Sequence, residues 1–201
     1  MSSLIRLSSS ETQLASNVIA RALYNYPLFR SLMPDPQQRK NRLPLLTGYL
    51  VRAGMLYGEA YTTSAKMEGV AVWLAPNTDI SVLELLFRVG LIACPLTLGL
   101  KVFQGAWNYV QHIEKLSQRH LSGSSWYLQV IGVTPAYQKQ GYGRSLIEPM
   151  LARFREQKIP CCLDTEEENN VAYYERYGFE VVEASTIAGT NNVCWFMVKE
   201  P

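Results

Sequence analysis

The chain has 201 residues, of which 48% are hydrophobic and 18% are charged, and its formal net charge is +2 at pH 7. This length and balance suit one well-packed domain spanning residues 1–201. The near-neutral charge, without a continuous Lys/Arg stripe, argues against a dedicated nucleic-acid binder. The first residues lack the apolar core of a signal peptide, so we expect a cytoplasmic protein without an integral membrane span.

The first part of the chain predicts a short strand, two helices and a pair of strands. Residues 4–7 suit the strand, and the polar run at 10–13 resembles the start of a helix with apolar positions at regular spacing. A second helix is expected over 38–51. Strand-forming residues at 58–62 and 69–74 flank a polar turn, which predicts an antiparallel meander.

A helical insertion is expected between residues 77 and 125. Apolar residues recur through 82–110 on both sides of Pro95, which predicts two or three helical pieces broken near that proline. The uninterrupted apolar core, 89–100, is shorter than the roughly twenty residues that a membrane-spanning helix needs. Three roles remain open for the insertion: a cover for the hydrophobic core, a wall or lid over an apolar acceptor pocket, or a peripheral membrane contact.

The most informative pattern follows the insertion. Residues 126–133 (WYLQVIGV) read as an apolar strand that ends at Pro135, and apolar residues at helical spacing begin at Leu146. The sequence QKQGYG, residues 138–143, lies between them at the expected N-terminus of the helix. Amide N–H groups without intrahelical acceptors and the positive end of the helix dipole favour a phosphate at this point.

Two glycines shape this loop. Gly141 and Gly143 let an anion approach the backbone and tolerate positive φ, while Lys139 and Arg144 add charge at the rim. A dinucleotide fingerprint is excluded because Leu146 stands where its third glycine is required, and the Gly-Lys-Ser/Thr of a Walker loop is also missing. The loop is therefore predicted to hold a pyrophosphate.

The rest of the chain predicts a strand at 160–165, a short helix ending near Gly178, and a hairpin of strands over 179–186 and 192–199. Strand, helix and strand in succession imply a right-handed parallel crossover, which places the glycine loop and the end of the second strand at one edge of the sheet. We therefore expect a mixed α/β (α+β) fold with a twisted central sheet of about seven strands, flanked by helices and carrying the helical insertion.

The four cysteines, Cys94, Cys161, Cys162 and Cys194, show neither metal-ligand spacing nor a recognisable Cys/His catalytic signature. We expect free, buried thiols and no metal site. Adjacent Cys161 and Cys162 should point to opposite faces of a strand.

The pattern Gln-x-x-Gly-x-Gly, placed after a strand ending in Val-x-Pro, resembles motif A of the GNAT superfamily of N-acetyltransferases, which hold the pyrophosphate of acetyl-CoA in such a loop. The likeness is dense from about residue 126 to residue 182 and is most similar to the puromycin N-acetyltransferase branch. The matching segments are residues 126–128, 133–135, 138–143, 162–165 and 174–179. The chain departs from that branch at Asp164, where glutamate is usual, and at the acidic run 166–168, so the acceptor can differ.

This resemblance implies a GNAT-like acyl-CoA N-acyltransferase fold with acetyl-CoA as its cofactor. The strand carrying residues 131–133 would splay from its parallel neighbour and pair with the pantetheine amides; its glycine near the end is consistent with a bulge or a close ligand approach. Tyr174 matches the acid that protonates the departing thiolate. Asn170 matches a cofactor-binding residue and also suits a helix N-cap. The residues assigned to the cofactor are Ile131, Gly132, Val133, Gln138, Lys139, Gln140, Gly141, Tyr142, Gly143, Arg144, Ser145 and Asn170.

The acceptor side is less marked. Tyr24 and Tyr26 occupy the region where related folds build the acceptor site, and Glu59 is expected on a central strand. The candidates for the general base are Glu59, Glu68, Asp164, Glu166 and a water chain. The run 166–168 reads most simply as a solvated acidic loop, with attraction of a cationic substrate as the alternative.

These features predict an enzyme that moves acetyl from acetyl-CoA to a primary amine of a small molecule by direct attack on the thioester. A protein or peptide N-acetyltransferase and a non-catalytic acyl-CoA-binding regulator remain alternatives. The bulky insertion favours an enclosed pocket over the open groove that a protein substrate needs. A monomer or homodimer is expected.

Overall fold

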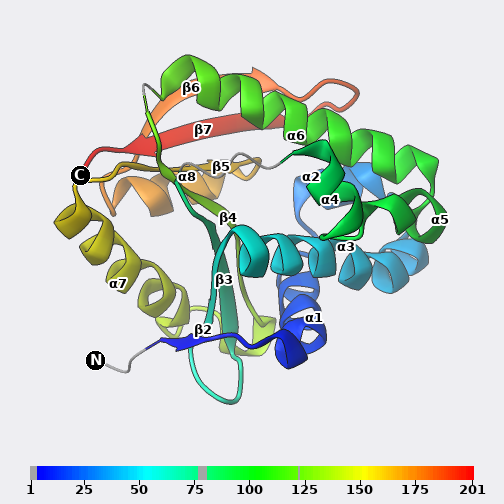
Figure 1. The fold of residues 1–201 in the computed structure, drawn as a ribbon, viewed down its shortest axis with the longest axis horizontal. Helices are drawn as coiled ribbons and strands as arrows, with labels where there is room; N and C mark the ends of the chain where they lie inside the picture. Colours follow the sequence, from blue (N-terminus) through cyan, green and yellow to red (C-terminus); the bar gives the residue numbers. More distant parts are fainter. Residues whose placement is uncertain (1–3, 77–80, 122) are drawn as a thin grey trace.

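The protein is described from a computed structural model that covers residues 4–76, 81–121 and 123–201. Its centre is a seven-stranded mixed sheet in the order β1-β2-β3-β4-β5-β7-β6 (Figure 1). The strands are β1 (Ile5–Arg6), β2 (Gly58–Thr62), β3 (Gly69–Leu74), β4 (Trp126–Val133), β5 (Cys161–Thr165), β6 (Glu180–Thr186) and β7 (Val193–Lys199). Strands β4 and β5 are parallel, and the other pairs are antiparallel. The mixed sheet predicted from the sequence is confirmed.

Helices cover both faces of the sheet. They are α1 (Thr12–Ala22), α2 (Pro27–Leu32), α3 (Pro36–Tyr57), α4 (Val82–Phe87), α5 (Cys94–Leu98), α6 (Leu100–His120), α7 (Tyr142–Gln157) and α8 (Glu168–Glu175), with short 3-10 turns at Ser9–Glu11, Leu91–Ala93 and Pro135–Tyr137. Helices α7 and α8 pack on one face, and α1, α3 and α6 pack on the other (Figure 1). Neighbouring Cys161 and Cys162 accordingly belong to different core clusters, as predicted. All four cysteines are free and buried.

The first predicted helix begins at Thr12, within the expected run 10–13, whereas the helix expected over 38–51 is α3, which starts earlier and ends later. The cap of the first lies at Ser8, whose side chain forms a capping box with Glu11 and starts a 3-10 turn that leads into α1. Helix α3 begins after Asp35, which accepts a 2.6 Å hydrogen bond from the Gln38 amide, and it continues through Pro44. Burial of one side of α3 against α1 and the sheet outweighs the helix-breaking effect of that proline.

In the described ranges the insertion forms three α-helical pieces, α4 to α6, whose breaks at Gly90 and Gly99 flank Pro95, so the prediction of helical pieces broken near this proline is confirmed. Pro95 lies in the first turn of α5, where its missing N–H costs nothing. The chain reverses instead at Gly90 and Gly99, whose φ values are +89° and +90°. Helix α3 supports both breaks, because Arg52 donates to the Val89 carbonyl (2.9 Å) and Arg42 donates to the Leu98 carbonyl (2.7 Å).

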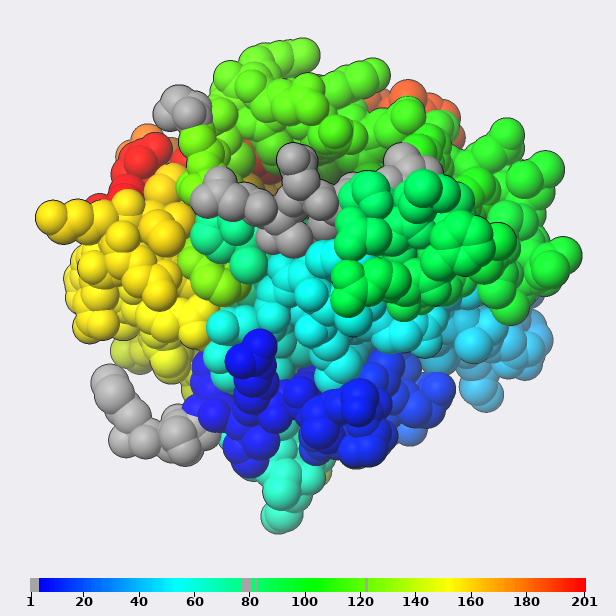
Figure 2. All heavy atoms as spheres, in the orientation of Figure 1, coloured from blue at the N-terminus to red at the C-terminus, as the bar shows by residue number. Residues whose placement is uncertain are grey.

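The outer surface of the insertion is apolar in places. In Figure 2 the green atoms of α4 to α6 form a continuous cover beside the cyan atoms of α3. Five of its large apolar side chains are more than half exposed: Leu83, Phe87, Ile92, Leu96 and Leu100. Among the helices in the described ranges, none combines the length and hydropathy required to cross a membrane.

The sheet divides between its two parallel strands. Strands β4 and β5 pair only over Trp126–Leu128 and Cys161–Leu163. Beyond Leu128, β4 remains paired with β3 on one side, while β5 remains paired with β7. A bulge in the β3–β4 register lies opposite Val72 and Trp73 and leaves Gln129 as the extra residue. The second half of β4 therefore lacks a strand partner on one edge within the described part of the chain.

Gly132 is not the bulge that its place near the end of the strand suggested. It pairs regularly with Val70. A Cβ at this position would lie 2.8 Å from the Ala22 Cβ and 3.2 Å from the Ile19 Cα. Glycine is needed here because α1 packs directly on β4.

Candidate active site

The glycine loop presents an open helix N-terminus. Gly141 is the N-cap of α7, has a φ of +89° and receives no side-chain cap. The first intrahelical hydrogen bond runs from the Ser145 amide to the Gly141 carbonyl at 3.0 Å, so the amides of Tyr142 to Arg144 precede it. A Cβ on Gly141 would meet no atom within 4 Å. The N-terminus of α7 can therefore accept an anion, as the sequence indicated.

Side chains around the loop brace it. The Gln138 side chain donates to the Val133 carbonyl (3.0 Å), and Gln140 donates to the Ala136 carbonyl (3.1 Å). Gln138 therefore holds the loop against the end of β4, and Gln140 holds it against the 3-10 turn that follows the strand.

Glycine is required at the two loop positions for different structural reasons. Gly143 does not have a positive φ, but a Cβ there would lie 3.0 Å from the Tyr173 hydroxyl, so this glycine serves close packing between α7 and α8. Exposed Lys139 has a φ of +62°. Arg144 forms an ion pair with Glu148 at 2.7 Å on the exposed side of α7.

A cavity of about 550 Å³ lies at the division of the sheet. Its lining comes from β4 and β5, from α8 on one face, and from α2, α3 and the insertion on the other. This volume lies within the range typical of small-molecule sites. Its wall is mostly apolar, including Leu85, Leu91, Phe103, Trp107 and Val110 of the insertion. The insertion therefore both covers the core and forms a pocket wall, two roles that the sequence left open.

Six residues singled out from the sequence as site candidates line this cavity: Tyr26, Ile131, Asn170 and Tyr174, and the base candidates Asp164 and Glu166. Asn170 lies within α8 and is not its N-cap, which is Glu167. The Asn170 side chain donates to the Thr165 hydroxyl at 3.2 Å, so it ties the helix to the end of β5.

Tyr174 combines burial with access to the cavity. Only 7% of the residue is exposed, and its ring packs edge-on against Phe179 at a centroid distance of 5.9 Å. Burial raises the pKa of the Tyr174 phenol, and the nearby charge of Asp164 raises it further. The hydroxyl therefore stays protonated at neutral pH, as a proton donor must.

Two expected acceptor residues lie elsewhere. The Glu59 carboxylate forms an ion pair with Arg153 of α7 at 2.6 Å and accepts a hydrogen bond from Tyr61 at 3.0 Å, and Glu59 does not line the cavity. Tyr24 donates to the Pro36 carbonyl at 2.9 Å and also lies outside the lining. Neither residue fits the acceptor role expected from the sequence.

Glu68 is also unsuited to be the base. Its carboxylate accepts 2.7 Å hydrogen bonds from the hydroxyls of Thr63 and Ser64 in the turn between β2 and β3. These bonds lower the pKa of Glu68, so it is a weak proton acceptor.

Asp164 and Glu166 form an acidic centre in the cavity. The two oxygens of Asp164 accept 2.6 Å hydrogen bonds from the hydroxyls of Tyr109 on α6 and Tyr127 on β4. Glu166 is only 6% exposed, so its assignment to a solvated loop was wrong. The Tyr26 hydroxyl accepts a 2.8 Å hydrogen bond from the Glu166 amide and turns this residue inward.

The two carboxyls have different electrostatic environments. Burial raises the pKa of Glu166 well above its ordinary value, and the Asp164 charge raises it further. Burial also raises the pKa of Asp164, but the phenols of Tyr109 and Tyr127 oppose that effect. Asp164 is therefore the better-stabilised anion of the two, and Glu166 holds its proton to a higher pH than Asp164 does. Oε1 of Glu166 is buried and has no hydrogen-bond partner among the described residues.

The same centre contains three side chains of the types that ligate metal ions. One carboxylate oxygen each from Asp164 and Glu166 and the sulfur of Cys194 lie within 4.8 Å of one another. Burial raises the pKa of Cys194, which keeps the thiol protonated and makes it a poor metal ligand. Both oxygens of Asp164 are already engaged by phenols, so this group does not fit a cation cage.

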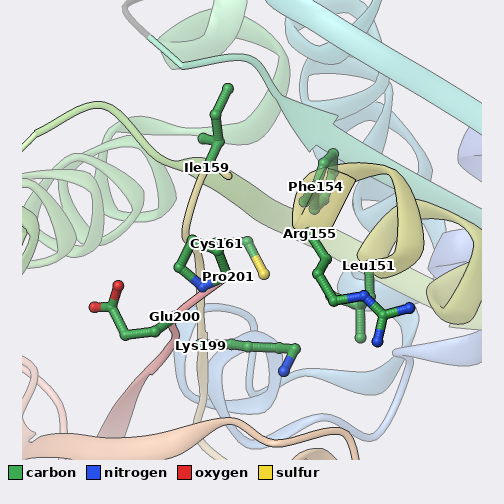
Figure 3. Close-up of a pocket in the computed structure, with 8 residues that line it drawn as sticks. All are labelled: Leu151, Phe154, Arg155, Ile159, Cys161, Lys199, Glu200 and Pro201. Carbon is green, nitrogen blue, oxygen red and sulfur yellow. The ribbon is translucent and has the colours of Figure 1, made fainter. Parts of the chain in front are cut away.

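Figure 3 shows a second, much smaller cavity, between α7 and the end of β7. Its volume is about 10 Å³, which is close to the space of one water molecule. Its walls include Phe154, Cys161 and Lys199. It is too small to hold a substrate.

The seven-stranded mixed sheet flanked by helices matches the fold of solved GNAT acetyltransferases. Residues 105–181 match the family model described as an acetyltransferase (GNAT) domain.

Several known acetyltransferases are similar to this chain in sequence or in fold. An uncharacterized N-acetyltransferase of Schizosaccharomyces pombe is 24% identical over 98% of this chain and 82% of its own length. A Corynebacterium glutamicum structure described as histone acetyltransferase HPA2 and related acetyltransferase has a TM-score of 0.69 at 18% identity, covering 100% of this chain and 97% of its own. Drosophila melanogaster polyamine N-acetyltransferase, which forms N-acetylagmatine, has a TM-score of 0.67 at 14% identity and 99% coverage of both chains.

Proposed function

We propose that the protein is an acetyl-CoA-dependent N-acetyltransferase whose acceptor is a primary amine of a small molecule. The observation that carries this proposal is one cavity that joins the unpaired edge of β4, the phenol of Tyr174 and the buried carboxyl of Glu166. Donor, acid and base would thus face one another inside the protein.

The described residues fit acetyl-CoA at the donor end. The amides at the start of α7 would hold its pyrophosphate, and Gly141 leaves room for it. The edge of β4 from Gln129 to Val133 would hydrogen-bond the pantetheine arm. When bound, the thioester supplies an activated acetyl group.

Glu166 and Tyr174 would move the protons. An ammonium must lose a proton before its nitrogen can attack a thioester carbon. The ionised form of Glu166 would accept it, and because burial raises the pKa of this carboxyl, its anion is a stronger base than an exposed carboxylate. As the new N–C bond forms and the C–S bond breaks, the Tyr174 hydroxyl gives its proton to the sulfur. Ammonium and thioester give amide, thiol and one proton, and the phenol regains its proton from solvent.

The alternatives receive less support. A protein or peptide acceptor needs an open groove, whereas the insertion forms a wall over this cavity. A regulator without turnover does not need a phenol and a carboxyl in the same cavity. The similarity to the puromycin N-acetyltransferase branch remains part of the proposal, and Asp164 and Glu166 lie where the chain departs from that branch.

The test combines binding with turnover. Calorimetry should show CoA binding, and release of free thiol from acetyl-CoA should depend on an added primary amine, with the N-acetyl product identified by mass spectrometry. Binding of CoA without amine-dependent thiol release, over a panel of small amines and peptides, would favour the regulator.

A further inference from the structure

Polar and apolar side chains lie in different parts of the cavity lining. Its charged groups cluster at the end of β5, where Asp164 and Glu166 lie, while α3 and the insertion supply apolar wall residues. One further acidic residue of the lining, Glu114, is exposed on α6. Apart from Glu114, a guest inside the cavity therefore meets carboxyl groups at the end of β5 and mostly apolar side chains elsewhere.

The unsatisfied polar atoms of the lining are acceptors. Among the described lining residues, two have buried side-chain atoms without a hydrogen-bond partner: Oε1 of Glu166 and Oε1 of Gln129. Only 6% of Glu166 is exposed, so leaving its buried carboxyl oxygen without a hydrogen bond is unfavourable in free energy. An ammonium group has three N–H donors and no acceptor, so it suits these atoms.

This inference rests on the function proposed above. We propose that the acceptor is a monocationic primary amine with a long or bulky apolar body. Its ammonium would be held by Asp164 and Glu166, and its apolar body would lie against the insertion. A second ammonium at the far end of the guest would be placed against apolar side chains such as Phe103 and Trp107 without a carboxylate of their own. Diamines and polyamines should therefore be poor substrates.

The sharpest test compares two amines of equal length. Octylamine and 1,8-diaminooctane share one reacting end and differ only at the other. We expect kcat/KM to be roughly 100-fold higher for octylamine, because burial of a second, unpaired charge is strongly unfavourable. Equal or better use of the diamine would overturn the proposal, since the cavity would then accept a dication.

A matched pair of variants tests the acidic centre. Glu166→Gln should raise KM for octylamine by roughly 10- to 100-fold, the effect of losing a hydrogen bond to a charged group, and should leave the Kd for CoA unchanged. Glu168→Gln, at an exposed position in the first turn of α8, is the control and should alter neither value. An unchanged KM in Glu166→Gln would remove Glu166 from recognition of the amine.

Failure of this inference can be separated from failure of the proposed function. Acetylation of 1,8-diaminooctane, agmatine or a peptide N-terminus in preference to octylamine would reject the apolar monoamine and leave the N-acetyltransferase intact. No acetylation of any of these amines by a protein that binds CoA would reject both.

Discussion

Tyr109 on the insertion donates a 2.6 Å hydrogen bond to Asp164 at the end of β5, across 55 positions of sequence. The insertion is therefore joined to the sheet at the point where the sheet divides. Because Tyr127 of β4 donates to the other oxygen of the same carboxylate, Asp164 links both sides of the division.

Removing the Tyr109 hydroxyl should loosen this link. We expect Tyr109→Phe to lower the free energy of unfolding by roughly 1.5–3 kcal/mol, since the lost bond is to a charged group. The control is Tyr49→Phe, which removes a longer bond of 3.3 Å to the neutral Thr97 hydroxyl and should cost less. Urea unfolding at pH 8 measures both; equal costs would mean that Asp164 does not carry the charge.

Two substitutions of Gly141 that differ only in charge test the proposed anion site. Its φ of +89° favours glycine, and asparagine and aspartate tolerate the left-handed region better than other side chains. Gly141→Asp should weaken CoA binding by roughly 100-fold, about 2.8 kcal/mol, because a carboxylate would occupy the anion position. Gly141→Asn carries a side chain of the same shape without the charge and should bind CoA more tightly than the aspartate variant. Equal calorimetric affinities for the two variants would mean that no phosphate binds there.

Tyr174→Phe should reduce kcat by roughly 100-fold, the lower end for a positioned acid, without a change in the Kd for CoA. Tyr177→Phe on the following turn, which loses only a 3.3 Å bond to the Tyr173 hydroxyl, is the matched control. Steady-state kinetics with a good amine acceptor measure both, and wild-type turnover in Tyr174→Phe would exclude the phenol as the acid.

The raised pKa of Glu166 has a consequence for stability. The folded state retains this proton after the unfolded chain has released it near the ordinary pKa of about 4.3, so stability falls as the pH rises from there towards the raised value. Glu166→Gln removes this loss. The thermal midpoint of the variant should therefore rise relative to wild type between pH 5 and pH 8, in the absence of amine. Parallel pH profiles for the two proteins would show that Glu166 is not protonated in the folded state.

The close approach of α1 to β4 can be tested with two glycines. Gly132→Ala would place a Cβ 2.8 Å from that of Ala22, and such overpacking typically costs about 1–3 kcal/mol. Gly123→Ala, whose Cβ would meet nothing within 4 Å, is the control and should leave the free energy of unfolding nearly unchanged. If both substitutions proved neutral, α1 would not be packed tightly on the strand.

The helix N-terminus at the glycine loop could be predicted because its signals are local. A strand, a glycine loop and a helix follow one another within residues 126–158, so spacing alone indicates where amides are exposed. Gly141 has the positive φ expected of it, whereas Gly143 is explained by Tyr173 of another helix, a contact that no local pattern reveals.

The proposed acceptor side was predicted only in part: Tyr26, Asp164 and Glu166 were among the candidates, but the sequence could not bring them together because they come from distant segments. Tyr109, Tyr127 and Asp164 come from the insertion and two strands. An acidic run such as Glu166 to Glu168 is usually solvated, and only the inward turn fixed by Tyr26 buries its first residue. One signal was available: Asp164 alternates with Cys162 along β5, so it had to share the face of a strand with a buried side chain.

The hydrogen bond between Tyr26 and Thr165 connects positions 139 apart in the sequence. Closing so long a loop costs more conformational entropy than forming the hairpin of β2 and β3 or the turn into α7. During folding, the nucleotide end should therefore become ordered before the acidic end, and a partly folded chain would capture the donor before it is able to select an acceptor.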